Sequence, residues 1–298
     1  MEKASNVITK IIKNKIYYLF LLPFYIFFIY FLVIPSVKVF YYSFFKINNI
    51  GFHLRFSGFD NYRNIFNDFR FWTAFINTTL MVVISIPMVV IISLFIANSI
   101  YREKSGLKTF VRAAIYIPAI TAEIVLIMTW KYIFNPRVGM LNYLISLVGI
   151  PPMDWLGSPS LAPFSVVLVV LTFSLGTPLI IYLASLGSIP DSYYEAALID
   201  GANKRKIFFK ITLPLLRPTT VFIIISMTIA FFQIFSTPYL MTDGGPVNST
   251  TTLVFLLYKT AFIYQNLGGA SVIGVVLFII CTTIAFFQYK YMSRDTEY

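Results

Sequence analysis

The chain has 298 residues, of which 58% are hydrophobic and only 12% charged, and its formal net charge is +11. Soluble domains are about 45–50% apolar and about 25% charged, so the composition excludes an ordinary soluble protein and predicts a polytopic membrane protein. A single cysteine and a single histidine exclude a disulfide framework and a zinc cluster, and no Gly-x-x-x-x-Gly-Lys-Ser/Thr loop is present to bind ATP.

Six stretches of the chain are long and apolar enough to cross a bilayer, which takes about 20 residues for each helix. The predicted spans are residues 17–37, 72–100, 113–134, 161–187, 217–240 and 269–289. We therefore expect an all-α membrane protein with six transmembrane helices, built as a single transmembrane domain over residues 1–298.

The basic residues set the orientation of these spans. Residues 1–16 form a basic N-terminus, which the positive-inside rule keeps in the cytoplasm. With six spans, fifteen of the 23 Lys and Arg residues then fall in cytoplasmic segments and both termini are cytoplasmic. The positive charge therefore follows from membrane topology and does not indicate a nucleic-acid partner. The first span is long, aromatic and without a small-x-small cleavage site, so we expect it to be retained.

Polar side chains within or beside apolar spans are the usual indicators of function in a membrane protein. Glu123 is predicted near the middle of the third span, where it could bond a neighbouring helix or subunit, line a substrate path or relay protons. For the other polar candidates, hydrogen bonds that hold helices together are favoured over contacts with a solute. The candidates for a substrate path are Asn77, Glu123, Ser174, Thr177, Gln233 and Tyr239.

A charged segment, residues 188–216, separates the fourth and fifth predicted spans. Its pattern predicts a short helix, a turn and a second short helix just outside the bilayer. Asp191 or Ser192 can cap the first helix, and Gly201 is placed to end it in a left-handed turn. Pro214 marks the return to the membrane. A structured polar segment of this kind is suited to receive force or a signal from a soluble partner.

Within this segment the chain reads Glu-Ala-Ala, three residues, Gly, nine residues, Ile, one residue, Leu-Pro. The pattern resembles the cytoplasmic coupling loop of permease subunits in binding-protein-dependent ABC importers. The resemblance implies an ATPase-coupling role, with Glu195 as the charged contact and Gly201 as the turn. Phe208 and Leu213 would anchor the second half of the loop. The residues assigned to the coupling loop are Glu195, Ala196, Ala197, Asp200, Gly201, Ala202, Phe208, Leu213 and Pro214.

Other short motifs resemble the carbohydrate permeases of the maltose and glycerol-phosphate type, and the resemblance extends over nearly the whole chain. The large external domain of the enterobacterial maltose permease is missing, so functions tied to that domain do not carry over. The motifs are Asn61-Tyr62, Trp130, Asn135-Pro136, Gly139 to Asn142, and Thr242 to Pro246 with Thr251.

The resemblance implies a multi-pass subunit of the bacterial cytoplasmic membrane that translocates a sugar or oligosaccharide. Its partners would be a second homologous permease, two cytoplasmic ATP-binding subunits, an extracellular solute-binding protein, the sugar and the lipid bilayer. ATP and Mg would be bound by the partner ATPase, so the chain itself is expected to hold no cofactor and no metal and to be no enzyme.

Three alternatives remain open. The chain could be an importer permease for another polar solute, such as an amino acid or phosphate. It could be a proton-coupled secondary transporter with Glu123 as the proton carrier, which predicts uptake without an ATPase. It could also be a scaffold that docks a soluble protein through residues 188–216 and moves no solute.

Overall fold

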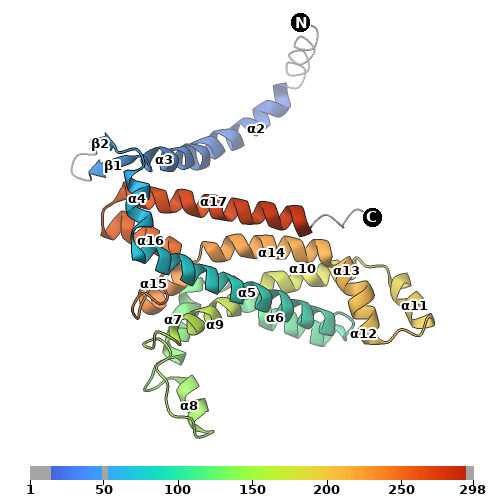
Figure 1. Ribbon diagram of the computed structural model, residues 1–298. Coiled ribbons are helices and arrows are strands. Elements are labelled where there is room, and N and C mark those ends of the chain that lie inside the picture. Colours follow the sequence, from blue (N-terminus) through green and yellow to red (C-terminus); the bar gives the residue numbers. More distant parts are fainter. Residues whose placement is uncertain (1–14, 49–52, 293–298) are drawn as a thin grey trace. The chain divides into compact units, whose positions relative to one another are not determined.

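The computed structural model describes residues 15–48 and 53–292, and most of them are helical (Figure 1). Within these described ranges three helices are long and apolar enough to cross a membrane, and three bent helix pairs raise the possible number of spans to six. The helical membrane fold predicted from the sequence is therefore confirmed. Most of the predicted N-terminal segment 1–16 lies outside the described residues.

The chain divides into two compact units, one built from residues up to 65 with 260–275, the other from residues 66–259 with residues from 276 onward. The prediction of a single domain over residues 1–298 stays a prediction, as does the location of the two termini.

The first unit begins with α2 (Lys15–Phe28), a π-helical turn η1 (Ile29–Val33) and α3 (Ile34–Tyr42). These elements form one apolar span over Leu19–Tyr42. A two-stranded antiparallel hairpin follows, in which β1 (Phe45–Asn48) pairs with β2 (His53–Phe56). This hairpin departs from the purely helical expectation.

The hairpin is tied to the next helix, α4 (Asp60–Phe66), by a buried amide. Asn61 Nδ2 donates to the carbonyl oxygens of Ser43, at 3.0 Å, and Phe45, at 2.9 Å. Tyr62 and Ser43 share a hydroxyl hydrogen bond of 2.8 Å. The unit also contains most of the π-helical turn η3 (Lys259–Ile263) and the first part of α17 (Leu267–Met292).

The second unit is organised around α5 (Phe69–Ile100). Asp68 caps this helix, because its carboxylate accepts a hydrogen bond of 2.9 Å from the Arg70 backbone N–H. At 1.5 Å per residue, 32 residues make a helix of roughly 48 Å. Along its length α5 packs against α9 (Ala162–Ser174), α10 (Gly176–Gly187), α14 (Arg217–Phe232) and α16 (Leu253–Tyr258).

The third, fourth and fifth predicted spans are not straight helices. Helix α6 (Ser105–Ile120) meets α7 (Glu123–Ile133) at 100°, α9 meets α10 at 43°, and the helix over Lys204–Leu215 meets α14 at 63°. The first break has a local cause: Pro118 lacks a backbone donor, the helix ends two residues later, and Thr121 is extended. The predicted span 217–240 ends early, at Phe232, and α15 (Ser236–Thr242) is a separate helix.

Two apolar clusters form the core of this unit. One gathers Val89, Ile127, Phe134, Val170 and Phe231 with their neighbours. The other, which we call the elbow-side core, joins the end of α5 to α10 and to the segment after it, and it includes Leu94, Tyr182, Leu186, Tyr194 and Leu216. The polar segment 188–216 is therefore anchored to the spans by an apolar base.

Candidate functional site

The segment 188–216, which we call the elbow, begins with helix α11 (Asp191–Ile199). Gly201 follows with a φ of +72°, which confirms the predicted left-handed turn. The Gly201 N–H donates to the Leu198 carbonyl at 3.0 Å and the Ala202 N–H donates to the Ala197 carbonyl at 2.9 Å. This pair of bonds is the Schellman arrangement, which satisfies the last carbonyls of the helix. The exit from α11 is therefore fixed by the backbone.

The second half of the elbow is a chain of short helical pieces. They are α12 (Lys204–Ile207), the π-helical turn η2 (Phe208–Thr212) and α13 (Leu213–Leu215). Asn203 caps α12, because its side-chain oxygen accepts a 2.9 Å hydrogen bond from the Lys206 N–H. The cap predicted for α11 is wrong: Pro190 occupies the capping position and Asp191 is the first helical residue, where its charge still suits the helix dipole.

The residues predicted for the coupling loop fall into two groups. Glu195, Ala196, Asp200, Gly201 and Pro214 are exposed. The others face inward or are partly covered: Ala197 is buried and Ala202 half-buried, while Phe208 and Leu213 pack against the elbow-side core. The elbow therefore has an inner face that holds it in place and an outer face that is open.

The outer face of α11 carries apolar side chains that were not predicted as site residues from the sequence. Ile199 is 87% exposed and Leu198 57% exposed. Tyr193, Ala196 and Ile199 follow one another at intervals of three, which puts them on one side of the helix. Apolar side chains that remain exposed on a polar segment are typical of a protein-binding surface. The interval was visible in the sequence, but only the burial of Tyr194 and Ala197 distinguishes the open side.

A cavity of about 370 Å³ lies where three of the helices are interrupted. Pro118, Thr121 and Glu123 come from the break between α6 and α7, Ser174 from the end of α9, and the stretch from Gln233 to Ser236 from the break after α14. Where a helix is interrupted inside a membrane protein, some backbone N–H and C=O groups lose their partners within the helix. Other protein groups or the water of a cavity must then provide their hydrogen bonds. In transporters, such breaks commonly surround the substrate.

Three of the six residues predicted for a substrate path line this cavity, namely Glu123, Ser174 and Gln233. Glu123 is at the first turn of α7 instead of the middle of a continuous span. Tyr239 is outside the lining, but its ring stacks on that of Phe235, a lining residue, with centroids 5.3 Å apart. Thr177 is exposed near the start of α10 and does not line the cavity.

The Asn77 amide holds a backbone turn, and its predicted place on the substrate path stays a prediction. Its Nδ2 donates to the backbone carbonyls of Asn248, at 2.7 Å, and Thr251, at 3.1 Å. Next to it, the Thr78 hydroxyl accepts a 2.9 Å hydrogen bond from the Leu253 N–H. These contacts fasten the turn after α15 to the beginning of α5.

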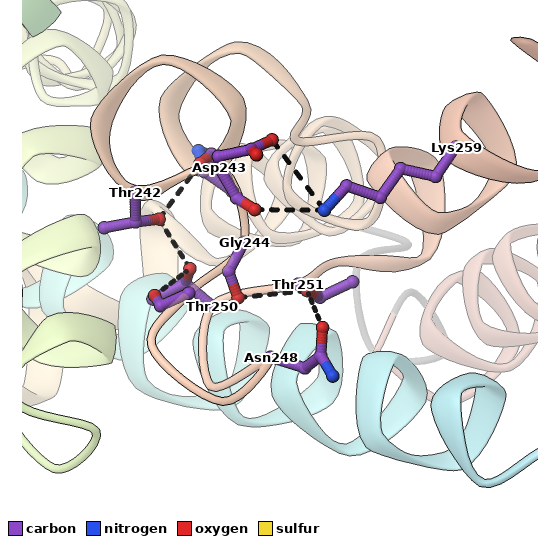
Figure 2. Close-up of polar contacts among 9 residues, drawn as sticks. Thr242, Asp243, Gly244, Asn248, Thr250, Thr251 and Lys259 are labelled. Carbon is purple, nitrogen blue, oxygen red and sulfur yellow. Dashed lines mark hydrogen bonds and ion pairs between the residues drawn. The ribbon is translucent and has the colours of Figure 1, made fainter. Parts of the chain in front are cut away.

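That turn, residues 242–252, is dense in internal hydrogen bonds (Figure 2). Asp243 and Gly244 are left-handed, with φ of 51° and 80°. The hydroxyls of Thr242 and Thr250 are 2.6 Å apart, and the Thr251 hydroxyl donates to the Gly244 carbonyl at 3.0 Å. Lys259 Nζ closes the turn by donating to the Asp243 carbonyl at 3.0 Å, with the Asp243 carboxylate 3.7 Å away (Figure 2).

The turn also reaches the cavity wall. The Thr252 hydroxyl donates to the carbonyl of Ile234, a lining residue, at 2.8 Å. Lys131 Nζ donates to the Leu240 carbonyl at 3.0 Å, which ties α7 to α15. The turn is therefore a brace for the backbone around the cavity, and the elbow lies at the opposite end of α5.

Residues 66–298 match the model of one protein family, described as the binding-protein-dependent transport system inner membrane component. This match covers well over half of the chain. The chain belongs to this family of transport permeases.

Several relatives share nearly the full length. The sulfoquinovosyl glycerol transport system permease SmoG of Agrobacterium fabrum is 34% identical over 86% of this chain and 84% of its own. The trehalose/maltose transport system permease MalF of Thermococcus litoralis is 31% identical over 94% and 95%. A crystal structure of a bacterial alginate ABC transporter, in complex with its alginate pentasaccharide-bound periplasmic protein, has the same fold, with a TM-score of 0.84, 22% identity and 96% of each chain covered.

Proposed function

We propose that this chain is the membrane-spanning subunit of an ATP-driven importer that translocates a sugar or oligosaccharide delivered by an external binding protein. It works with a second homologous permease and two cytoplasmic ATP-binding subunits, which bind the ATP and Mg. The chain itself carries the solute path and the elbow and has no catalytic role. Its place is the bacterial cytoplasmic membrane.

The observation that carries the proposal is the outer face of α11. Glu195 and the apolar side chains of Ile199 and Leu198 are exposed on a segment that is rigidly capped at Gly201 and anchored to the elbow-side core. A rigid, exposed, partly apolar helix can bind a partner and transmit the partner's movement to the membrane-spanning helices. A loosely held loop would absorb that movement.

The substrate path runs through the cavity at the three helix breaks. Its polar groups are one carboxylate, an amide and hydroxyls, with aromatic rings from Phe173, Phe231 and Phe235. Hydroxyl-rich solutes are recognised by such hydrogen-bonding groups together with apolar ring faces. Among the described residues that line the cavity there is no Lys or Arg, which favours a neutral sugar over a phosphate or another anionic solute.

The relatives support a sugar or glycoside as the substrate, because one of them is named for the neutral sugars trehalose and maltose and another for sulfoquinovosyl glycerol, a glycoside that carries a sulfonate. The family name supports dependence on a binding protein. Within the cavity Glu123 and Gln233 are the groups that bond sugar hydroxyls, and Ser174 lines the same cavity from α9.

The experiment that tests the proposal measures ATPase activity of the chain co-purified in lipid with the second permease and the ATPase. Candidate binding proteins are added with and without trehalose, maltose or longer glucosides. We expect sugar-loaded binding protein to stimulate hydrolysis, and Gly201→Asp to remove the stimulation while the complex still assembles. An aspartate side chain fits at this position without a clash, since nothing lies within 4 Å of an added Cβ. It strains the left-handed turn, however, and adds charge beside the outer face of α11.

Gly149→Asp is the matched control. Gly149 has a φ of +79° and equally open surroundings, but it lies after α8 (Met140–Ser146), outside the elbow. It should therefore keep the stimulation. If no ATPase co-purifies with the wild-type chain, or if both variants behave alike, the elbow is not the coupling element.

A further inference from the structure

Besides the apolar packing of the elbow-side core, Arg102 connects α11 to the turn between α5 and α6. Arg102 lies in residues 101–104, between α5 and α6, about ninety residues from α11 in the sequence. Its Nη2 is 3.6 Å from the Asp191 carboxylate. Its Cζ lies 4.3 Å from the centre of the Tyr194 ring. Asp191 and Tyr194 are three positions apart and so lie on the same side of α11.

The two contacts of Arg102 differ in strength. Arg102 and Asp191 are 56% and 77% exposed, so their ion pair is screened by water and contributes little. Tyr194 is only 6% exposed, and its ring belongs to the elbow-side core. A guanidinium over the face of a ring that is withdrawn from water is held more firmly than an exposed ion pair. The contact with Tyr194 is therefore the one that fixes Arg102.

Tyr194 is itself a junction within the elbow. The Thr212 hydroxyl donates to the Tyr194 hydroxyl at 3.5 Å, which links α11 to the second half of the elbow. On the other side, Lys108 Nζ donates to the Tyr101 carbonyl at 3.1 Å and lies 4.9 Å from the Tyr101 ring centre. The turn is thereby fixed to the first turn of α6.

Helix α6 leads from this turn to the cavity. Its last residues include Pro118 and Ala119, which line the cavity wall next to the break before Glu123. A movement of α11 that carries Tyr194 along therefore pulls the turn through Arg102 and shifts the base of α6.

We propose that Arg102 is a positioning residue that clamps the coupling helix to the α5–α6 turn, so that movement of α11 is transmitted to the cavity wall through α6. This inference rests on the proposed function. The competing hypothesis is that Arg102 only supplies positive charge on one side of the membrane, in which case its position over the Tyr194 ring is incidental.

The test compares Arg102→Gln with Lys104→Gln in the complete complex, reconstituted in lipid with both permeases, the ATPase and the sugar-loaded binding protein. Lys104 is exposed and lies in the same turn, so the two variants lose the same charge from the same place. The quantity measured is sugar imported per ATP hydrolysed. We expect Arg102→Gln to lower this ratio about fivefold, the size of losing one cation–π contact whose cation is exposed to water, and Lys104→Gln to leave it unchanged.

Substitutions of Tyr194, whose ring contacts Arg102, give a second measurement. Tyr194→Phe keeps the ring under the guanidinium and should keep the ratio, whereas Tyr194→Leu should lower it as Arg102→Gln does. In the Tyr194→Leu background, Arg102→Gln should add no further loss, because the two residues act as one contact. Additive losses would overturn the clamp.

The outcomes separate this inference from the proposed function. If the wild-type complex shows no sugar-stimulated hydrolysis, the proposed function fails whatever Arg102 does. If the wild type is stimulated and the two glutamine variants have the same ratio, only the clamp is wrong. Failure of the Arg102→Gln complex to assemble would also overturn it, since the clamp is assigned to transmission of movement and not to assembly.

Discussion

Gly244 shows how one residue can determine the shape of a functional segment. It lies in the turn after α15 with a φ of 80°, a backbone region that costs most side chains about 1–2 kcal/mol. There is also no room for a side chain. An added Cβ would lie 2.5 Å from Thr251 Oγ1 and 2.7 Å from a carbon of the Phe255 ring. The close threonine and phenylalanine are the same groups that shape the turn and the start of α16.

Gly244→Ala is therefore expected to destabilise the purified protein by about 2 kcal/mol or more, because strain and steric overlap add. The midpoint of thermal unfolding in detergent measures this. Gly106→Ala is the matched control, since Gly106 lies in the first turn of α6 with nothing within 4 Å of an added Cβ. An unchanged midpoint for Gly244→Ala would mean that the turn is not held as described.

At the scale of single residues, the sequence predicted a backbone conformation more readily than the partner of a polar side chain. Gly201 was predicted in the left-handed turn, because a glycine directly after a short helix most often ends that helix in this conformation. Asn77 was placed on the substrate path, although its amide is used by two backbone carbonyls about 170 positions away. A polar side chain in a span looks the same in sequence whether it faces solute or backbone.

Among the elements, α5 has contacts with functional segments at both ends. Thr78 near its beginning holds the turn before α16, and the turn after Ile100 holds α11 through Arg102. The helix is continuous between these two contacts, although Pro87 lies within it, whereas two other helix pairs are broken at Thr121 and at Leu175.

Thr78→Val tests the connection at the beginning of α5. Valine has nearly the same shape, but the buried Leu253 N–H would lose its acceptor, and an unpaired buried donor costs about 1–3 kcal/mol. We expect a lower unfolding midpoint and faster hydrogen exchange at Leu253. Thr73→Val makes the same change five residues earlier in α5, where the hydroxyl donates to the Phe69 carbonyl of its own helix, and should be nearly neutral.

The elements themselves were only partly predictable. Apolar length predicts stretches that correspond to the three long helices and the three bent helix pairs of the described residues, but it does not indicate where a helix breaks. The break at Thr121 and Ala122 lies in an apolar stretch, and Pro118 was the local indication. Likewise, hydropathy alone extends the fifth span to residue 240, although the backbone turns at Gln233. The first break therefore has a local cause in Pro118, whereas the hydropathy pattern carries no signal for the second.

For the whole molecule, the decisive question is whether Glu123 binds solute or carries protons. Glu123→Gln keeps the size and the hydrogen-bonding ability of the side chain but removes its charge. We expect sugar uptake by the reconstituted importer to fall about tenfold, because hydrogen bonds to charged groups are the stronger ones, with assembly intact. Uptake of radiolabelled sugar into proteoliposomes loaded with ATP measures this.

Two controls accompany that measurement. Asp60→Asn removes another carboxylate, one that forms only an exposed ion pair with Lys46, and should leave uptake unchanged. A protonophore should also have no effect on the wild type. Uptake that collapses with the proton gradient and needs no ATP would identify the chain as a secondary transporter.

The two anchoring contacts of α5 are separated along the helix by a distance close to the thickness of a membrane's hydrocarbon layer. From Thr78 to Ile100 the rise is roughly 33 Å, against about 30 Å for the layer. A thinner membrane makes such a helix tilt. Tilting displaces the turn at one end and the elbow at the other in opposite lateral directions. The length of the lipid acyl chains should therefore alter how closely movement of the elbow is coupled to movement of the turn at the other end of α5, without any change in the sequence.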